Sequence, residues 1–289
     1  MLMIFDGYDL FIFGVVLPVV MNEWGLTPVQ AGALGSYSLF GMMFGALLLG
    51  MLADKIGRKN GIIVAFVVFS VATFLNGFAT HTTDFGLARF FAGLGCGGLM
   101  PNAVALINEL APRRMRNTLV TLMFSGFSLG GVFAAGLGIY LMPKFGWNIM
   151  FFAGAAPLLL LPFIIYYLPE SLGFLIRKGR HDEARSMLQK IQPDSEPVDP
   201  SAEVVVIERK TVAKGTILDL FTEGRLIGTL AFWVAFFCCL LMVYALGSWL
   251  PKLMNNAGYS LGSSLSFLLA LNFGGAVGAI LGGWLGDRY

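Results

Sequence analysis

Residues 50–60, GMLADKIGRKN, form a short charged stretch that joins two long apolar runs, residues 31–52 and 61–78. Each run is long enough to cross a membrane as a helix, which takes about 20 mostly apolar residues. Gly50 and Gly57 permit a tight turn and a close approach between two helices. The stretch is therefore predicted to be the turn of a membrane-spanning helical hairpin.

The charges of this turn indicate a second role. Asp54 can pair with a basic side chain or cap the N-terminus of a neighbouring helix, and Arg58 is a basic partner four residues away. Contacts of this kind can hold one conformation and release it in another. Gly50, Asp54, Gly57 and Arg58 are therefore predicted to form a conformational latch, and the alternative is a charged turn that only anchors the hairpin.

The composition indicates that the membrane-spanning character of this hairpin applies to the whole chain. Of the 289 residues, 57% are hydrophobic and 12% are charged, with a mean hydropathy of +0.77, whereas a soluble domain carries about 25% charge. The net charge of +2 gives no indication of a nucleic-acid partner. The sequence predicts an all-α integral membrane protein, and its three cysteines, Cys96, Cys238 and Cys239, are expected to be small buried side chains within apolar runs.

Eight stretches are long and apolar enough to span a membrane. They are residues 1–20, 31–52, 61–78, 85–107, 118–141, 147–168, 226–250 and 263–285. The even-numbered loops hold fifteen Lys and Arg residues and the odd-numbered loops hold two. Basic residues concentrate on the cytoplasmic side, so the even loops and the N-terminus are predicted to be cytoplasmic.

The chain is predicted to have three parts. Residues 1–168 form a six-helix bundle whose first helix lacks its beginning, and residues 226–289 form the first two helices of a second bundle. The polar segment 169–225 is expected to be a cytoplasmic loop, in which residues 181–191 have helical spacing.

An internal repeat supports this division. Residues 50–55, GMLADK, and 283–288, GWLGDR, each close the second span of their half on the same side. Asp287 is therefore predicted to be the counterpart of Asp54 in the latch. The alternative is a chance similarity of glycine-rich helix ends.

The fourth span contains Arg89 followed by several glycines, in the run RFFAGLGCGG of residues 89–98. Gly93, Gly95 and Gly98 match a dinucleotide-binding pattern, but that pattern needs a preceding strand, so a smooth helix-packing face is the better interpretation. An arginine inside a span is costly and marks a candidate functional site. The alternative for Arg89 is a side chain that reaches back to the membrane surface.

Two aspartates lie inside the first span, in the quartet Asp6-Gly7-Tyr8-Asp9. At i and i+3 they share a helix face, and two charged carboxylates are expensive in hydrocarbon. Burial and mutual repulsion favour protonation of at least one of them. Asp6 and Asp9 are therefore predicted to form a proton-binding site, and a structural Asp–Arg pair is the alternative.

These motifs resemble those of the major facilitator superfamily. Residues 50–60 are similar to the loop between its second and third helices, and residues 89–98 are similar to its fourth-helix motif, whose arginine is linked to proton coupling. The first-helix D-G-x-D, together with Arg89 and Glu109, resembles the aromatic acid:proton symporter family in its benzoate-transporter branch. The resemblance implies the major facilitator superfamily fold, with eight of its twelve transmembrane helices present.

The resemblance also implies a function. It suggests proton-coupled uptake of aromatic carboxylates, such as benzoate or hydroxybenzoate, by alternating access. Asp6, Asp9 and Arg89 would couple the proton, and Glu109 would be an essential charged position; an interfacial salt bridge with Arg113, Arg114 or Arg116 is the alternative for Glu109. The alternative substrates are a dicarboxylate such as muconate, or a sugar, while a channel and a membrane-bound enzyme have little support.

Several polar and aromatic residues are candidates for the substrate cavity. Aromatic rings can stack on a benzoate ring, and polar side chains can either contact substrate or join helices by hydrogen bonds. Packing is the alternative for each of them. The candidates are Tyr37, Phe124, Ser125, Tyr244, Trp249 and Asn272.

No cofactor, metal or catalytic residue is predicted, since His81 and His181 fall in loops on opposite sides and no catalytic motif occurs. The expected partners are an aromatic acid, protons and the lipid bilayer. The predicted location is the bacterial inner membrane, with a monomeric full-length protein.

Overall fold

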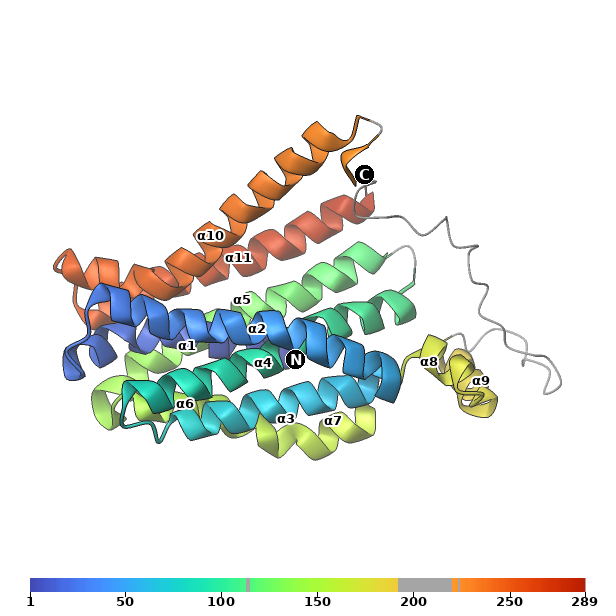
Figure 1. The fold of residues 1–289 in the computed structure, drawn as a ribbon, viewed down its shortest axis with the longest axis horizontal. Coiled ribbons are helices and arrows are strands. Elements are labelled where there is room, and N and C mark those ends of the chain that lie inside the picture. Colours follow the sequence, from blue (N-terminus) through green and yellow to red (C-terminus); the bar gives the residue numbers. More distant parts are fainter. Residues whose placement is uncertain (113–114, 192–219, 223, 289) are drawn as a thin grey trace.

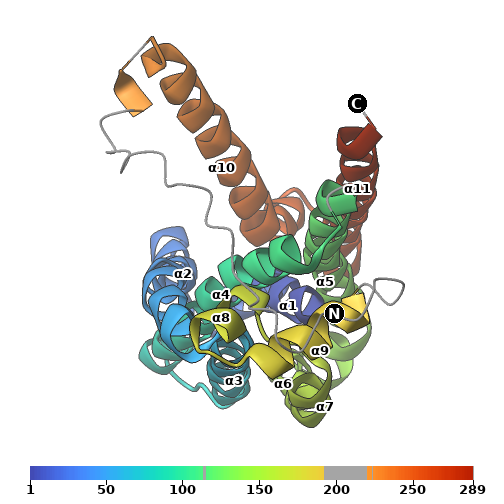
Figure 2. The ribbon, with the colours of Figure 1, turned by 90° about the vertical axis from the view of Figure 1, so that its right-hand side faces the viewer.

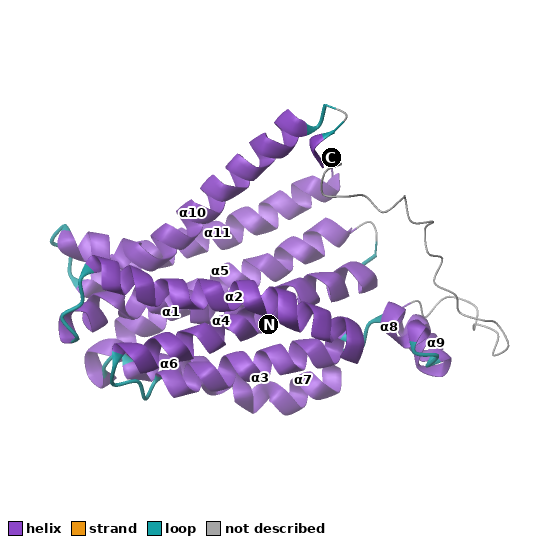
Figure 3. Ribbon diagram, viewed as in Figure 1, coloured by secondary structure: helices purple, strands orange, loops and turns teal. Residues whose placement is uncertain are grey.

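The computed structural model describes residues 1–112, 115–191, 220–222 and 224–288, and in these residues every regular element is a helix (Figure 3). Arg113, Arg114 and residues 192–219 of the predicted cytoplasmic loop lie outside the described residues. The elements are α1 (Leu2–Glu23), α2 (Pro28–Ile56), α3 (Arg58–Asn76), α4 (Thr82–Leu110), α5 (Arg116–Phe145), α6 (Asn148–Ala155), η2 (Ala156–Leu160), α7 (Leu161–Tyr167), α8 (Leu172–Arg177), α9 (His181–Ile191), α10 (Leu226–Asn256) and α11 (Leu261–Arg288).

Eight helical segments of the described chain are long and apolar enough to cross a membrane, as the sequence predicts. The sixth, Asn148–Tyr167, consists of α6, the 3₁₀ turn η2 and α7. Pro157 and Pro162 cause this break, because proline removes a backbone donor and clashes with the preceding helical turn.

The spans lie side by side along one axis, and α8 and α9 lie beyond one end (Figure 1). This end, where α2, α4 and α11 finish and α3, α5 and α10 begin, is called the basic end because it carries Lys55, Arg58 and Lys59. The opposite end is called the loop end. At the loop end α10 lies against the other helices, and toward the basic end it diverges from them (Figures 1 and 2).

Helices α2 and α4 pack through reciprocal glycines. A Cβ on Gly41 or Gly45 would overlap the backbone of α4, and a Cβ on Gly93 or Gly97 would overlap the backbone of α2. Each pair is spaced i, i+4, so it forms a smooth strip on one helix face. This confirms helix packing as the role of the fourth-span glycines.

The cysteine expectation is correct only in part. Cys96 of α4 is buried, whereas Cys238 and Cys239 of α10 are exposed. Cys238 and Cys239 lie in an apolar run because α10 turns most of its surface away from the rest of the described chain. No residue in the most apolar part of α10 is buried. An apolar run in a membrane protein does not distinguish lipid contact from protein contact.

Candidate functional site

A buried ion pair joins α1 to α4. Arg89 donates from Nη1 to Asp9 Oδ2 at 2.9 Å and to the Asp9 carbonyl at 3.1 Å, and from Nη2 to Ser38 Oγ of α2 at 3.3 Å. Thr73 of α3 donates from Oγ1 to Asp9 Oδ1 at 2.6 Å. Asp9 and Arg89 are each 1% exposed, so Arg89 does not reach the membrane surface, and the two charges neutralise each other within the bundle.

Asp6 lies one helical turn nearer the basic end than Asp9 and has a different environment. It is also 1% exposed, but neither of its oxygens accepts a hydrogen bond within the described chain. The weakly polar thiol of Cys96 lies nearby on α4. The two aspartates that the sequence groups together are therefore distinct, because one is fully paired and the other is not.

Arg89 also borders a cavity of about 230 Å³ between α1, α2, α4 and α10. The wall contributed by α10 carries Tyr244, Ser248 and Trp249, and Phe13 of α1 contributes a further ring. The Phe13 ring centroid lies 6.0 Å from the Arg89 guanidinium carbon. A cation at one side and aromatic rings around it are suited to a small aromatic anion.

The other candidate lining residues lie outside this cavity. Tyr37 packs its ring on Gly86 of α4, and the Ser125 hydroxyl donates to the Leu122 carbonyl of its own helix. Asn272 borders a separate apolar cavity of about 210 Å³ between α1, α5, α10 and α11. Phe124 is half-buried on α5 and borders neither cavity.

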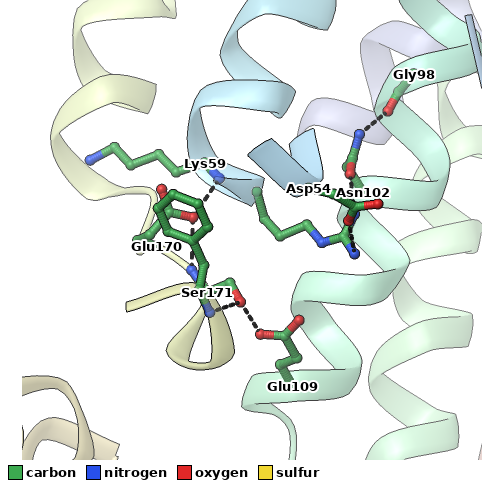
Figure 4. A network of polar contacts seen from close by, with 9 residues as sticks. Asp54, Lys59, Gly98, Asn102, Glu109, Glu170 and Ser171 are labelled. Atoms are coloured by element: carbon green, nitrogen blue, oxygen red, sulfur yellow. Dashed lines mark hydrogen bonds and ion pairs between the residues drawn. The ribbon is translucent and has the colours of Figure 1, made fainter. Parts of the chain in front are cut away.

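Two of the predicted latch residues, Asp54 and Arg58, meet at the basic end, where Asp54 lies near Asn102 of α4 (Figure 4). Asp54 and Arg58 form an ion pair at 2.8 Å, and Arg58 donates to Asn102 Oδ1 of α4 at 2.9 Å. Gly57 has φ of +101°, which favours glycine at this turn. A Cβ on Gly50 would meet no atom of the described residues within 4 Å, so these residues do not make the close helix contact expected there.

Glu109 has a different partner from the arginines considered in the sequence. Its carboxylate accepts a short hydrogen bond from the hydroxyl of Ser171, which is the N-cap of α8 (Figure 4). The adjacent Glu170 accepts from the backbone N–H of Lys59 at 3.0 Å. Helix α3 begins after Gly57, which has no side chain to cap it, so Glu170 satisfies one of its free N–H groups.

Asp287 of α11 caps the N-terminus of α5. Its carboxylate accepts from the backbone N–H of Thr118 at 2.7 Å and of Asn117 at 3.2 Å. Both belong to the first turn of α5, where the partial positive charge of a helix favours an anion. Asp54 and Asp287 therefore lie at the same end of the bundle but have different partners.

The sequence interpretation missed Thr73, Ser38 and Glu170 as partners of these groups. Each of these contacts joins residues at least 51 positions apart, and hydroxyl side chains within spans have no distinctive spacing. Among the described residues, no three His, Cys, Asp or Glu side chains are grouped to hold a metal ion.

Residues 1–289 match the family described as the Major Facilitator Superfamily, and the chain belongs to this superfamily. It is 47% identical to the benzoate transport protein of Acinetobacter baylyi, over 100% of this chain and 63% of that protein. It is 36% identical to the 4-hydroxybenzoate transporter PcaK of Pseudomonas putida, over 98% of this chain and 64% of that protein. The chain thus spans just under two thirds of these relatives.

Solved structures show the same fold. The crystal structure of a D-xylose-proton symporter matches 100% of this chain and 67% of its own, with a TM-score of 0.71 and 17% identity. A bacterial homologue of the lysosomal transporter Spinster matches 99% of this chain and 60% of its own, with a TM-score of 0.68 and 20% identity. These findings confirm the predicted family and the predicted fold of a multi-pass membrane protein.

Proposed function

We propose that the full-length protein takes up aromatic carboxylates together with protons by alternating access. The observation that carries the proposal is the position of Arg89, which forms the buried ion pair with Asp9 and also borders the aromatic-lined cavity. The Arg89 guanidinium would pair with the Asp9 carboxylate in one state and with a substrate carboxylate in another. Binding of a proton to Asp9 would thereby be coupled to binding of an anion in the cavity.

The coupling follows from charge balance. While Asp9 is charged, it occupies Arg89, and a second carboxylate nearby would be strongly repelled. Protonation of Asp9 weakens the ion pair and leaves the Arg89 guanidinium available for the substrate carboxylate. Loss of the proton restores the ion pair and displaces the substrate. Tyr244, Trp249 and Phe13 would hold the ring, while Thr73 and Ser38 orient the pair.

The relatives support this substrate class, since the curated proteins named above carry benzoate and 4-hydroxybenzoate in their names. The alternative is another small solute, such as a dicarboxylate or a sugar. An aromatic-lined cavity that holds one cation favours a monocarboxylate with a ring, because a dicarboxylate would leave one charge unpaired in a dry site.

The remaining assignments belong to the same proposal. The protein would lie in the bacterial inner membrane with its basic end in the cytoplasm, as the distribution of Lys and Arg indicates. Residues 1–168 and 226–289 would belong to two bundles joined by a cytoplasmic loop. Asp54, Arg58 and Asp287 would hold conformations at the cytoplasmic side, and the protein would act as a monomer.

The test is uptake of radiolabelled benzoate by cells that express the full-length gene product with or without Asp9→Asn. The wild type should accumulate benzoate against its gradient, and unlabelled aromatic acids should compete while glucose and muconate should not. The asparagine variant cannot carry the proton, so it should lose accumulation yet retain exchange of external for internal benzoate.

A matched control is Asp182→Asn, which removes an exposed carboxylate on α9 and should leave accumulation unchanged. Accumulation by Asp9→Asn with an unaltered pH dependence would exclude Asp9 as the coupling site. Competition by glucose or muconate but by no aromatic acid would exclude the substrate class.

A further inference from the structure

The cavity beside Arg89 presents polar groups from different helices. Among the described residues that line it, Arg89 of α4 is the charged group, and Tyr244 and Ser248 of α10 carry hydroxyls. The hydrogen bonds of Arg89 in the described chain go to Asp9 of α1 and Ser38 of α2, so the α10 hydroxyls belong to a separate wall. A ligand that pairs with Arg89 can therefore contact α10 through another part of its structure.

Ser248 differs from other serines of the spans in having an uncommitted hydroxyl. A serine within a helix commonly donates to a backbone carbonyl one turn earlier. Ser36 does so to the Ala33 carbonyl at 2.7 Å, and Ser266 does so to the Gly262 carbonyl at 3.0 Å. Ser248 makes no hydrogen bond within the part of the chain that the structure describes, and it borders the cavity. Its hydroxyl is therefore available to a ligand.

The crossing of α1 and α10 fixes the height of Ser248 in the cavity. A Cβ on Gly14 would lie 3.0 Å from the Ser248 Cα, and Gly14 directly follows Phe13 on α1. The Phe13 ring centroid lies 6.0 Å from the Arg89 guanidinium carbon. Ser248 is therefore at the height of the ring that accompanies the cation.

Two aromatic rings confine a ligand at this height. The Phe13 ring packs on Gly35 of α2, where an added Cβ would lie 2.8 Å from Phe13 Cε1. The ring of Trp249, the residue after Ser248, packs on Gly32 one turn earlier in α2, with 3.7 Å between an added Cβ and Trp249 Cζ2. The cavity of about 230 Å³ is smaller than the sites of drug-sized ligands, about 300–1,000 Å³. It suits a molecule with a single ring.

A hydroxyl on the ring of an aromatic acid matches the uncommitted Ser248 hydroxyl. A serine hydroxyl both donates and accepts, so it can bond a phenol in either direction. A ring hydroxyl at carbon 3 or 4 points away from the carboxylate, whereas a hydroxyl at carbon 2 lies beside the carboxylate, on the Arg89 side. A site that bonds a ligand hydroxyl disfavours the analogue without it, because the protein group is then left unpaired.

We propose that Ser248 is a specificity-determining residue that binds the ring hydroxyl of 3- or 4-hydroxybenzoate while Arg89 holds the carboxylate. This inference rests on the proposed function and narrows its substrate class to aromatic acids with a hydroxyl away from the carboxylate. Tyr244 is the competing hydroxyl, because it lines the same cavity one turn earlier on α10.

Ligand affinities of the purified full-length gene product test the assignment. Benzoate and its 2-, 3- and 4-hydroxy derivatives are titrated calorimetrically into the wild type and Ser248→Ala. The wild type should bind 3- or 4-hydroxybenzoate at least about fivefold more tightly than benzoate, the size of one hydrogen bond. Ser248→Ala should lower this ratio to about one, and it should bind benzoate and 2-hydroxybenzoate as the wild type does.

Two further variants serve as controls. Tyr244→Phe removes the competing hydroxyl and should retain the preference. Ser266→Ala, at an exposed serine on α11, is the matched control and should change no affinity. Each variant is judged by the ratio of two ligands, so a fraction of unfolded protein does not alter the outcome.

A wild type without the preference, a preference that survives Ser248→Ala, or one that is lost in Tyr244→Phe would overturn the inference and leave the proposed function standing. An equal loss of affinity for all four acids in Ser248→Ala would also overturn it, because Ser248 would then act on the cavity as a whole. A wild type that binds no aromatic acid would overturn both, so the two failures are distinguishable.

Discussion

Thr73 holds one oxygen of Asp9 while Arg89 holds the other, so two helices define the position of a single carboxylate. Both donors are buried with the carboxylate. In the proposed cycle, Thr73 would therefore orient Asp9 alongside the arginine, although it carries no charge.

Replacing Thr73 by valine keeps the shape of the side chain and removes the donor. The expected result is a loss of about tenfold in proton-driven accumulation of benzoate, the size of one hydrogen bond to a charged group. Ser70→Ala is the matched control, because Ser70 is buried one turn away on the same helix and its hydroxyl has no partner in the described chain. An equal loss in both variants would indicate a general effect on α3.

The site was predictable from the sequence where the residues are unusual in a membrane. Asp6, Asp9 and Arg89 are conspicuous because ionised groups are rare within spans, and the structure does pair Asp9 with Arg89. Which aspartate is paired, and with which hydroxyls, depends on the rotation of four helices about their axes. That rotation is decided by packing contacts between distant residues, which a local pattern does not encode.

Helices α2 and α4 form a single packing unit because their backbones touch along the reciprocal glycines. An added methyl group has no space in such a contact, and the helices would have to separate. Hydropathy and glycine spacing predicted these elements and their smooth faces. The break in the sixth span was less evident, because proline is tolerated inside α1, α4, α5 and α10.

Gly93→Ala is therefore expected to destabilise the protein by about 1–3 kcal/mol, the usual cost of overpacking. Thermal unfolding of the purified protein in detergent would show a lower midpoint. Gly136→Ala on α5 is the matched control, because nothing lies within 4 Å of a Cβ there. Equal midpoints for the two variants would show that α2 and α4 can separate without cost.

At the scale of the whole molecule, charge is distributed between two ends. Fifteen Lys and Arg residues belong to the even-numbered loops and two to the odd-numbered loops, and the described parts of the even loops lie at the end that carries α8 and α9 (Figure 1). Translocation of basic loops is disfavoured, so the proposed topology places this end in the cytoplasm.

In intact cells, a maleimide that does not cross membranes should label Lys252→Cys near the loop end and should not label Lys178→Cys after α8. Both variants carry alanine in place of the native cysteines. Permeabilised cells provide the control, since Lys178→Cys should then react. The reverse pattern would place the basic end outside the cell.

The cap that Asp287 places on α5 joins the basic ends of two helices that are far apart in the sequence. In the proposed cycle, this contact between a carboxylate and a helix N-terminus would favour the conformers in which α5 and α11 lie together at that end. Because mobile ions screen exposed charges, the balance of conformers would then shift with the ionic strength of the solution at the basic end.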